Sequence, residues 1–182
     1  MPSRWFASLP NLITIGRLVV TPGIIYMVIE EDWRMAFALF VVAGISDALD
    51  GWLAKTFHLQ SELGAVLDPL ADKTLIISIY VCLADAGRLP VWLAILVVSR
   101  DALILGGVIV AWFVARPIKV QPHMSSKVTT AFQILLAAVV LASQALGFEA
   151  EALENLLIAS VAALTIASAS VYLWLWVQHM RP

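Results

Sequence analysis

The chain has 182 residues, of which 62% are apolar and 13% charged, with a formal net charge of −2. Its mean hydropathy of +0.93 is that of a membrane protein and excludes an ordinary soluble domain. No basic tract indicates nucleic-acid binding, and the single Cys82 excludes an internal disulfide framework.

Six apolar stretches have about the length that a helix needs to cross the hydrocarbon layer. They cover residues 12–29, 35–54, 65–84, 90–114, 128–146 and 153–177. Trp5 and Phe6 precede the first stretch and predict a juxtamembrane segment with an aromatic anchor. Because the connections are short, we expect one all-α integral membrane domain over residues 1–182, with six transmembrane helices and antiparallel neighbours.

The distribution of basic residues predicts the orientation in the membrane. One side carries Arg4, Lys55, Arg116, Lys119, Lys127 and Arg181, whereas the other carries only Arg34 and Arg88. We therefore expect both termini to be cytoplasmic, in a bacterial cytoplasmic (inner) membrane. On the other side, a solvated acidic face is expected from Glu30, Glu31, Asp32, Asp85, Glu149, Glu151 and Glu154.

Four aspartates interrupt the apolar residues where the second predicted helix ends and the third begins. The pattern D-x2-D-G-x2-A-K-x8-G-x3-D-x3-D is formed by Asp47, Asp50, Gly51, Ala54, Lys55, Gly64, Asp68 and Asp72. A charged side chain at bilayer depth costs roughly 2.5–3.5 kcal/mol on insertion scales. Four such charges therefore indicate a bound ligand.

Helix geometry indicates what that ligand is. Asp47 and Asp50 share one helix face, as do Asp68 and Asp72. If the chain turns back between the two helices, the pairs meet at one depth, and their oxygens suit one or two Mg²⁺ or Mn²⁺ ions. The small residues of the pattern let either a neighbouring helix or a bulky ligand approach the backbone.

Other polar residues lie inside apolar stretches, where each is either a structural interhelical contact or a functional group. Asn11, Thr14 and Arg17 recur at three-residue spacing on one face of the first helix. For Arg17, Arg100 and Lys127 we favour function, because intramembrane cations usually face a polar cavity. We expect Asp101 to neutralise Arg17 or Arg100, whereas snorkelling and function both remain open for Lys73.

The aspartate pattern resembles the signature of the CDP-alcohol phosphotransferase family. Lys55 stands where that family more often has arginine, so the charge is kept but the bidentate fork is lost. Ser99-Arg100-Asp101 and residues 126–133 are most similar to CMP-forming, eukaryotic-type cardiolipin synthases, with phosphatidylglycerophosphate synthases next.

This resemblance implies a phosphatidyltransferase that uses CDP-diacylglycerol and releases CMP, with two Mg²⁺ or Mn²⁺ ions per site. Asp47, Asp50, Asp68 and Asp72 would hold the metals, and Asp72 would also act as general base. The CDP-lipid would be bound by Asp47, Gly51, Ala54, Lys55, Gly64, Asn11 and Thr14. The acceptor phosphate would be bound by Arg17, Arg100 and Lys127.

The acceptor is less well determined than the donor. We expect phosphatidylglycerol, giving cardiolipin, with glycerol 3-phosphate as the alternative, since the charge count does not decide between them. Clustered intramembrane aspartates also suit a divalent-cation transporter, although no acidic trail beyond Asp101 leads across the membrane. The small residues Ala159 to Ser170 predict close packing, either within the chain or in a homodimer.

Overall fold

A computed structural model describes residues 4–56, 62–113 and 124–180 of the chain. Its described residues form six helices: α1 (Arg4–Ile29), α2 (Trp33–Thr56), α3 (Glu62–Asp85), α4 (Val91–Phe113), α5 (Met124–Leu146) and α6 (Glu151–Met180). The all-α prediction is confirmed, and the helices correspond one to one with the six apolar stretches.

The largest difference from the predicted bounds is at the first helix. α1 begins at Arg4 rather than at residue 12, so the expected juxtamembrane segment is continuous with the helix. Apolar residues lie on both sides of Pro10, and helices in membranes tolerate an internal proline. The predicted start at residue 12 is therefore eight residues too late.

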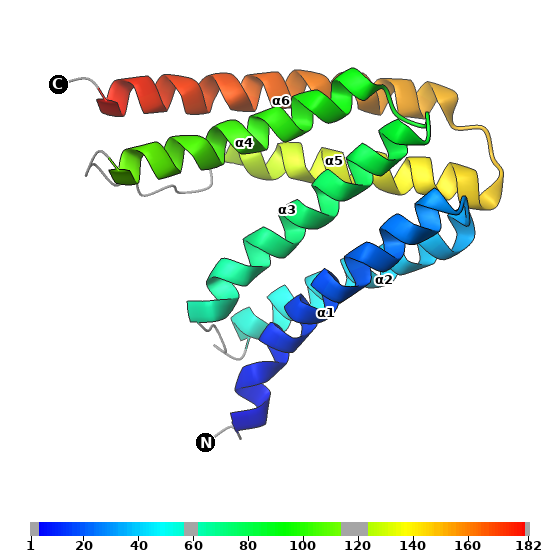
Figure 1. Cartoon of the computed structure of the whole chain (residues 1–182), viewed down its shortest axis with the longest axis horizontal. Coiled ribbons are helices and arrows are strands. Elements are labelled where there is room, and N and C mark those ends of the chain that lie inside the picture. The colour runs from blue at the N-terminus through cyan, green and yellow to red at the C-terminus, as the bar shows by residue number, and fades with distance from the viewer. Residues whose placement is uncertain (1–3, 57–61, 114–123, 181–182) are drawn as a thin grey trace.

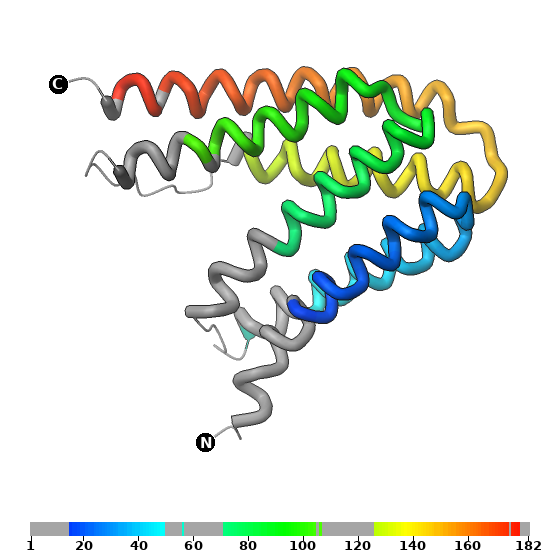
Figure 2. The backbone as a smooth tube through the Cα atoms, viewed as in Figure 1, coloured from blue at the N-terminus to red at the C-terminus, as the bar shows by residue number. Residues whose placement is uncertain are grey.

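The helices form two limbs of three. In the first limb α1 packs on α2 and α3, and in the second α6 packs on α4 and α5. The limbs meet at the end that holds the connections 30–32, 86–90 and 147–150, which we call the turn end, and they separate toward the opposite end (Figure 1). The two limbs are joined by packing of α2 on α5 and by contacts of α3 with α4 and α5, and the tube in Figure 2 shows that α3 runs obliquely to the helices of the second limb.

Left-handed residues end three helices at the turn end. Glu31 and Gly87 have φ values of 58° and 68°, and the N–H group of each donates to a carbonyl three residues back at 3.1 Å. Gly147 has a φ of 69° and donates four residues back at 2.9 Å. Glycine adopts this conformation without a steric penalty, but Glu31 does not. Asp32 then starts α2, because its carboxylate accepts the N–H of Met35 at 3.1 Å.

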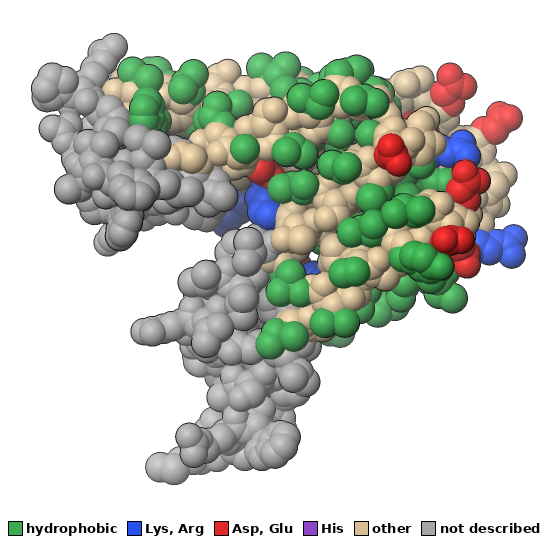
Figure 3. All heavy atoms as spheres, in the orientation of Figure 1, with side chains coloured by type: hydrophobic (Ala, Val, Ile, Leu, Met, Phe, Trp, Pro, Cys, Tyr) green, Lys and Arg blue, Asp and Glu red, His purple; other side chains and the backbone are tan. Residues whose placement is uncertain are grey.

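The surface and the interior differ as expected for a membrane protein. Buried aliphatic side chains from all six helices surround Tyr80, whose hydroxyl donates to the Gln133 carbonyl at 3.1 Å. Figure 3 shows hydrophobic side chains over the visible outer face, with acidic side chains gathered at the turn end. Most of the predicted acidic face is exposed, although Glu154 also accepts the Ser143 hydroxyl at 2.6 Å.

Two helices in the described part of the chain are long and apolar enough to cross a membrane by length and composition. They are Ser126–Leu146 and Glu151–Gln178, with mean hydropathies of 1.7 and 2.1. A shorter apolar helix covers Ile15–Ile29. The prediction of six helices is thus confirmed, whereas six membrane crossings stay a prediction.

Candidate active site

Arg17 joins the first three helices at the aspartate signature. Its guanidinium contacts Oδ1 of Asp47 in α2 through Nη2 and Oδ1 of Asp72 in α3 through Nη1. Arg17 is only 3% exposed, whereas the two carboxylates are 48% and 41% exposed. The two halves of the signature therefore meet at Arg17, and both partner carboxylates are partly exposed.

Two of the four predicted metal ligands can be placed in this way. The other two predicted metal ligands, Asp50 and Asp68, lie outside the residues whose side chains the structure describes. The same holds for six of the predicted CDP-lipid residues, namely Asn11, Thr14, Gly51, Ala54, Lys55 and Gly64. Among the described side chains, no group of three or more acidic, histidine or cysteine residues surrounds one point. Asp47 and Asp72 do converge on one positive charge, so the described half of the donor set fits a divalent cation.

A second polar cluster lies beside the first, and we call it the Arg100 cluster. Arg100 donates from Nη1 to Asp101 at 2.5 Å and from Nη2 to the hydroxyls of Ser126 at 2.8 Å and Ser168 at 2.7 Å. Its guanidinium also lies 5.9 Å from the ring centre of Tyr172. Through these contacts Arg100, which is only 2% exposed, links α4 to α5 and α6 in the interior.

Lys73 connects the Arg100 cluster to the aspartates. Its ammonium donates to both oxygens of Asp101 at 2.8 Å, and it follows Asp72 directly in α3. The expected pairing of Asp101 with Arg100 is confirmed, and Asp101 also neutralises Lys73. The two clusters therefore form one polar layer that crosses the bundle through neighbouring residues of α3. Figure 3 shows acidic and basic side chains at the inner angle between the limbs.

The three cations predicted for the acceptor phosphate have different surroundings. Arg17 binds the signature aspartates, and Arg100 is held in its own cluster. Lys127 is exposed on α5, next to Ser126. Their common role in binding one phosphate stays a prediction.

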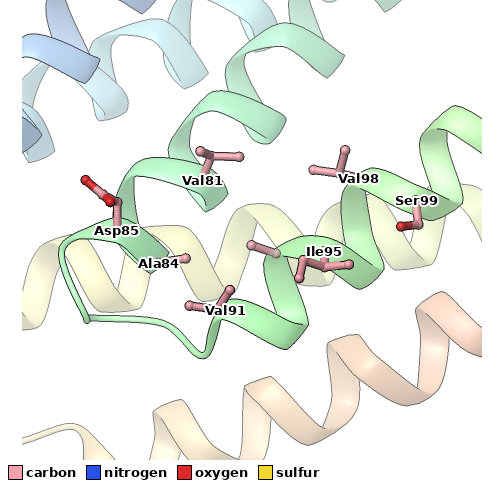
Figure 4. Close-up of a pocket in the computed structure, with 8 residues that line it drawn as sticks. Val81, Ala84, Asp85, Val91, Ile95, Val98 and Ser99 are labelled. Atoms are coloured by element: carbon pink, nitrogen blue, oxygen red, sulfur yellow. The ribbon is translucent and has the colours of Figure 1, made fainter.

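An apolar groove lies between α3 and α4 and reaches Ser99, the residue before Arg100. It has a volume of about 420 Å³ and is lined mostly by aliphatic side chains between Val81 and Asp85 of α3 and between Val91 and Ser99 of α4 (Figure 4). Val81 follows Asp72 by nine residues, or about 14 Å of helix rise. The groove is therefore not the site that the aspartates form.

Sequence reasoning missed the contribution of α6. Ser168 and Tyr172 both contact Arg100, whereas the small residues 159–170 predict only a packing surface. Thr165, Ser168 and Tyr172 recur at spacings of three and four, which places them on one helix face. This polar series is the sequence signal from which the contact of α6 with a polar group could have been predicted.

Comparison with known proteins agrees with the geometry. The sequence profile of the CDP-alcohol phosphatidyltransferase family matches residues 7–176. A Homo sapiens protein named cardiolipin synthase (CMP-forming) is 34% identical in an alignment that covers 91% of this chain and 60% of that protein. A Schizosaccharomyces pombe fusion of cardiolipin synthase (CMP-forming) with a mitochondrial hydrolase is 35% identical in an alignment that covers 91% of this chain and 30% of the fusion.

A relative with a different printed activity is also similar. The Oryza sativa chloroplastic CDP-diacylglycerol–glycerol-3-phosphate 3-phosphatidyltransferase 1 is 37% identical in an alignment that covers 92% of this chain and 56% of that protein. The chain thus spans between 30% and 60% of the length of these relatives. The match over residues 7–176, together with the meeting of Asp47 and Asp72, shows that the chain belongs to the CDP-alcohol phosphatidyltransferase family.

Proposed function

We propose that this protein transfers the phosphatidyl group of CDP-diacylglycerol to the hydroxyl of phosphatidylglycerol, giving cardiolipin and CMP. The observation that carries the proposal is the meeting of Asp47 from α2 and Asp72 from α3 around Arg17. Burying carboxylates in an apolar bundle is unfavourable, and binding the cations that a pyrophosphate substrate needs would compensate for that cost.

The signature residues divide the chemistry between them. Asp47, Asp50, Asp68 and Asp72 would hold two Mg²⁺ or Mn²⁺ ions, and bound metals would neutralise charge on the pyrophosphate. Asp72 would take the proton of the acceptor hydroxyl, for which its 41% exposed carboxylate is accessible. Lys55 would contact a phosphate of the nucleotide. Gly51, Ala54 and Gly64, with Asn11 and Thr14, would leave room for the CDP-lipid and contact it.

The acceptor would bind on the side of the Arg100 cluster. Lys73 and Arg100 carry two positive charges against the single negative charge of Asp101, which leaves one in excess. A single excess charge matches the phosphodiester of phosphatidylglycerol, and exposed Lys127 follows Ser126, which accepts a hydrogen bond from Arg100. The similarity to proteins named cardiolipin synthase supports the same acceptor.

Glycerol 3-phosphate is the second candidate acceptor, supported by the rice relative. The test gives purified protein labelled CDP-diacylglycerol with either acceptor and separates the lipid products. We expect cardiolipin from phosphatidylglycerol and little product from glycerol 3-phosphate. Efficient formation of phosphatidylglycerophosphate without cardiolipin would overturn the proposed acceptor and leave the family intact.

We further propose that the protein lies in a membrane as a six-helix homodimer with the aspartate site on the cytoplasmic side. The apolar helices support the membrane location. The relatives include proteins named mitochondrial or chloroplastic, so they do not support a bacterial inner membrane over an organelle membrane. Light scattering of the protein in detergent tests the dimer, and a monomer mass would contradict it.

A further inference from the structure

Arg17 contacts both of the described carboxylates that are proposed to hold a divalent cation. Its two terminal nitrogens reach Oδ1 of Asp47 and Oδ1 of Asp72, so one guanidinium spans the carboxylates of α2 and α3. A metal bound between the two helices would draw on the same acidic oxygens, because hard divalent cations prefer carboxylates.

The surroundings of Arg17 favour its replacement at the two carboxylates by a metal ion. Arg17 is 3% exposed, and neither its Nε nor its Nη2 has a hydrogen-bond partner among the described residues, so its contact with Asp47 is an ion pair without hydrogen-bond geometry. A buried N–H without a partner is unfavourable, so the guanidinium is held chiefly by the two carboxylates. Asp47 and Asp72 are each more than two-fifths exposed, which allows a metal ion to approach them from solvent.

We propose that Arg17 and a divalent cation compete for Asp47 and Asp72, so that metal binding releases the Arg17 guanidinium toward the anionic substrates. This inference rests on the metal-dependent reaction proposed above. A double positive charge and a guanidinium beside the same two carboxylates repel each other, and the charge bound more strongly displaces the other. The released fork then offers parallel N–H donors to a phosphate, which is the geometry that guanidinium groups bind well.

The alternative role for Arg17 is purely positional. In that case Arg17 holds the carboxylates in place and remains there when the metal binds. The two roles predict opposite effects of removing the guanidinium on metal affinity. Competition predicts tighter metal binding without Arg17, and positioning predicts weaker binding.

Binding of Mn²⁺ in detergent, followed by electron paramagnetic resonance without any lipid substrate, separates the two roles. We expect Arg17→Gln to bind Mn²⁺ about tenfold more tightly than wild type, or more, because a competing positive charge is removed. Arg17→Lys should stay close to wild type. The matched control is Arg34→Gln, which removes an exposed cation at the turn end and should leave the affinity unchanged. Equal or weaker binding by Arg17→Gln would overturn the proposal.

Two further readouts keep the test decisive. If Arg17→Gln does not fold, the arginine side chains of wild type can be followed by ¹⁵N spectroscopy. The Arg17 signal is the one that is lost in Arg17→Lys. We expect this signal to shift when Mg²⁺ is added. An unshifted signal at saturating Mg²⁺ would overturn the proposal. If wild type binds no Mn²⁺, the proposed metal chemistry fails as well. If it binds Mn²⁺ but shows no competition, only the role of Arg17 fails.

Discussion

At the scale of single residues, Asp72 is the group whose proposed role is most specific. Its carboxylate is in contact with Arg17 and is accessible to the acceptor, as a general base must be. Replacing it by Asn removes the proton acceptor and keeps the shape. We expect Asp72→Asn to lower turnover by about 10²-fold or more while binding of CDP-diacylglycerol is retained. Turnover should be followed as CMP release, and binding as retention of labelled CDP-lipid.

Asp47→Asn is the comparison variant for Asp72→Asn. Asp47 contacts the same guanidinium but has no proposed role in proton transfer, so its loss should weaken Mn²⁺ binding along with the rate. Loss of CDP-lipid binding in parallel with the rate for Asp72→Asn would leave Asp72 only a metal-holding role.

Asp101 is predicted to matter for stability. Its side chain is 7% exposed and neutralises both Arg100 and Lys73. Asp101→Ala leaves the buried Arg100 without its anionic partner, which should cost about 3–5 kcal/mol of unfolding free energy. Asp85→Ala, which removes an exposed carboxylate from the last residue of α3, should change the unfolding free energy by about 0.5 kcal/mol or less. Denaturant titration in micelles measures both, and equal effects would contradict a structural role for Asp101.

Residue types and spacing predicted part of the site. Helix periodicity placed Asp47 with Asp50 and Asp68 with Asp72 on one face each, and the meeting of Asp47 with Asp72 followed only on the assumption that the chain turns back between the two helices. The partner of Arg17 did not follow, since a buried cation pairs with whichever carboxylate the tertiary packing brings nearest. Lys73 was ambiguous for the same reason, because its partner Asp101 lies 28 residues away on α4.

At the scale of elements, the ends of α1 and α3 offer a matched pair of opposite predictions. Glu31 and Gly87 occupy the same left-handed position, and space around the Gly87 Cα is open. Glu31→Gly should raise the unfolding free energy by about 1 kcal/mol, and Gly87→Ala should lower it by about 1–2 kcal/mol. Thermal unfolding in micelles tests the signs, with Glu30→Gly as the neighbouring control. A destabilising Glu31→Gly would show that its side chain makes a contact that outweighs the backbone strain.

Helices were predictable because apolar length and turn residues are local signals. The acidic run 30–32, Gly87 and Gly147 each mark a connection that the structure contains. The packing of α6 against Arg100 was not predictable, because its polar face is visible only once α4, α5 and α6 are known to be neighbours. Hydropathy also does not show that the limbs diverge from the turn end (Figure 1).

At the scale of the whole molecule, the polar layer should open toward the side that carries Lys127, opposite the turn end. In a Cys82→Ala background, cysteines introduced at Lys127 and at Glu149 should react with an impermeant thiol reagent from opposite sides of sealed vesicles. Both positions are exposed, so accessibility depends on the side of the membrane and not on burial. Labelling of both from the same side would contradict the predicted orientation.

The central claim is metal-dependent transfer of a phosphatidyl group at the aspartate site. The most direct measurement reconstitutes the protein in liposomes with labelled CDP-diacylglycerol and phosphatidylglycerol as the sole acceptor, and follows CMP and cardiolipin together. With Mg²⁺ present we predict that the two products form in equal amounts, that EDTA stops both and that added Mg²⁺ restores both. CMP release without cardiolipin, or full activity in EDTA, would contradict the account.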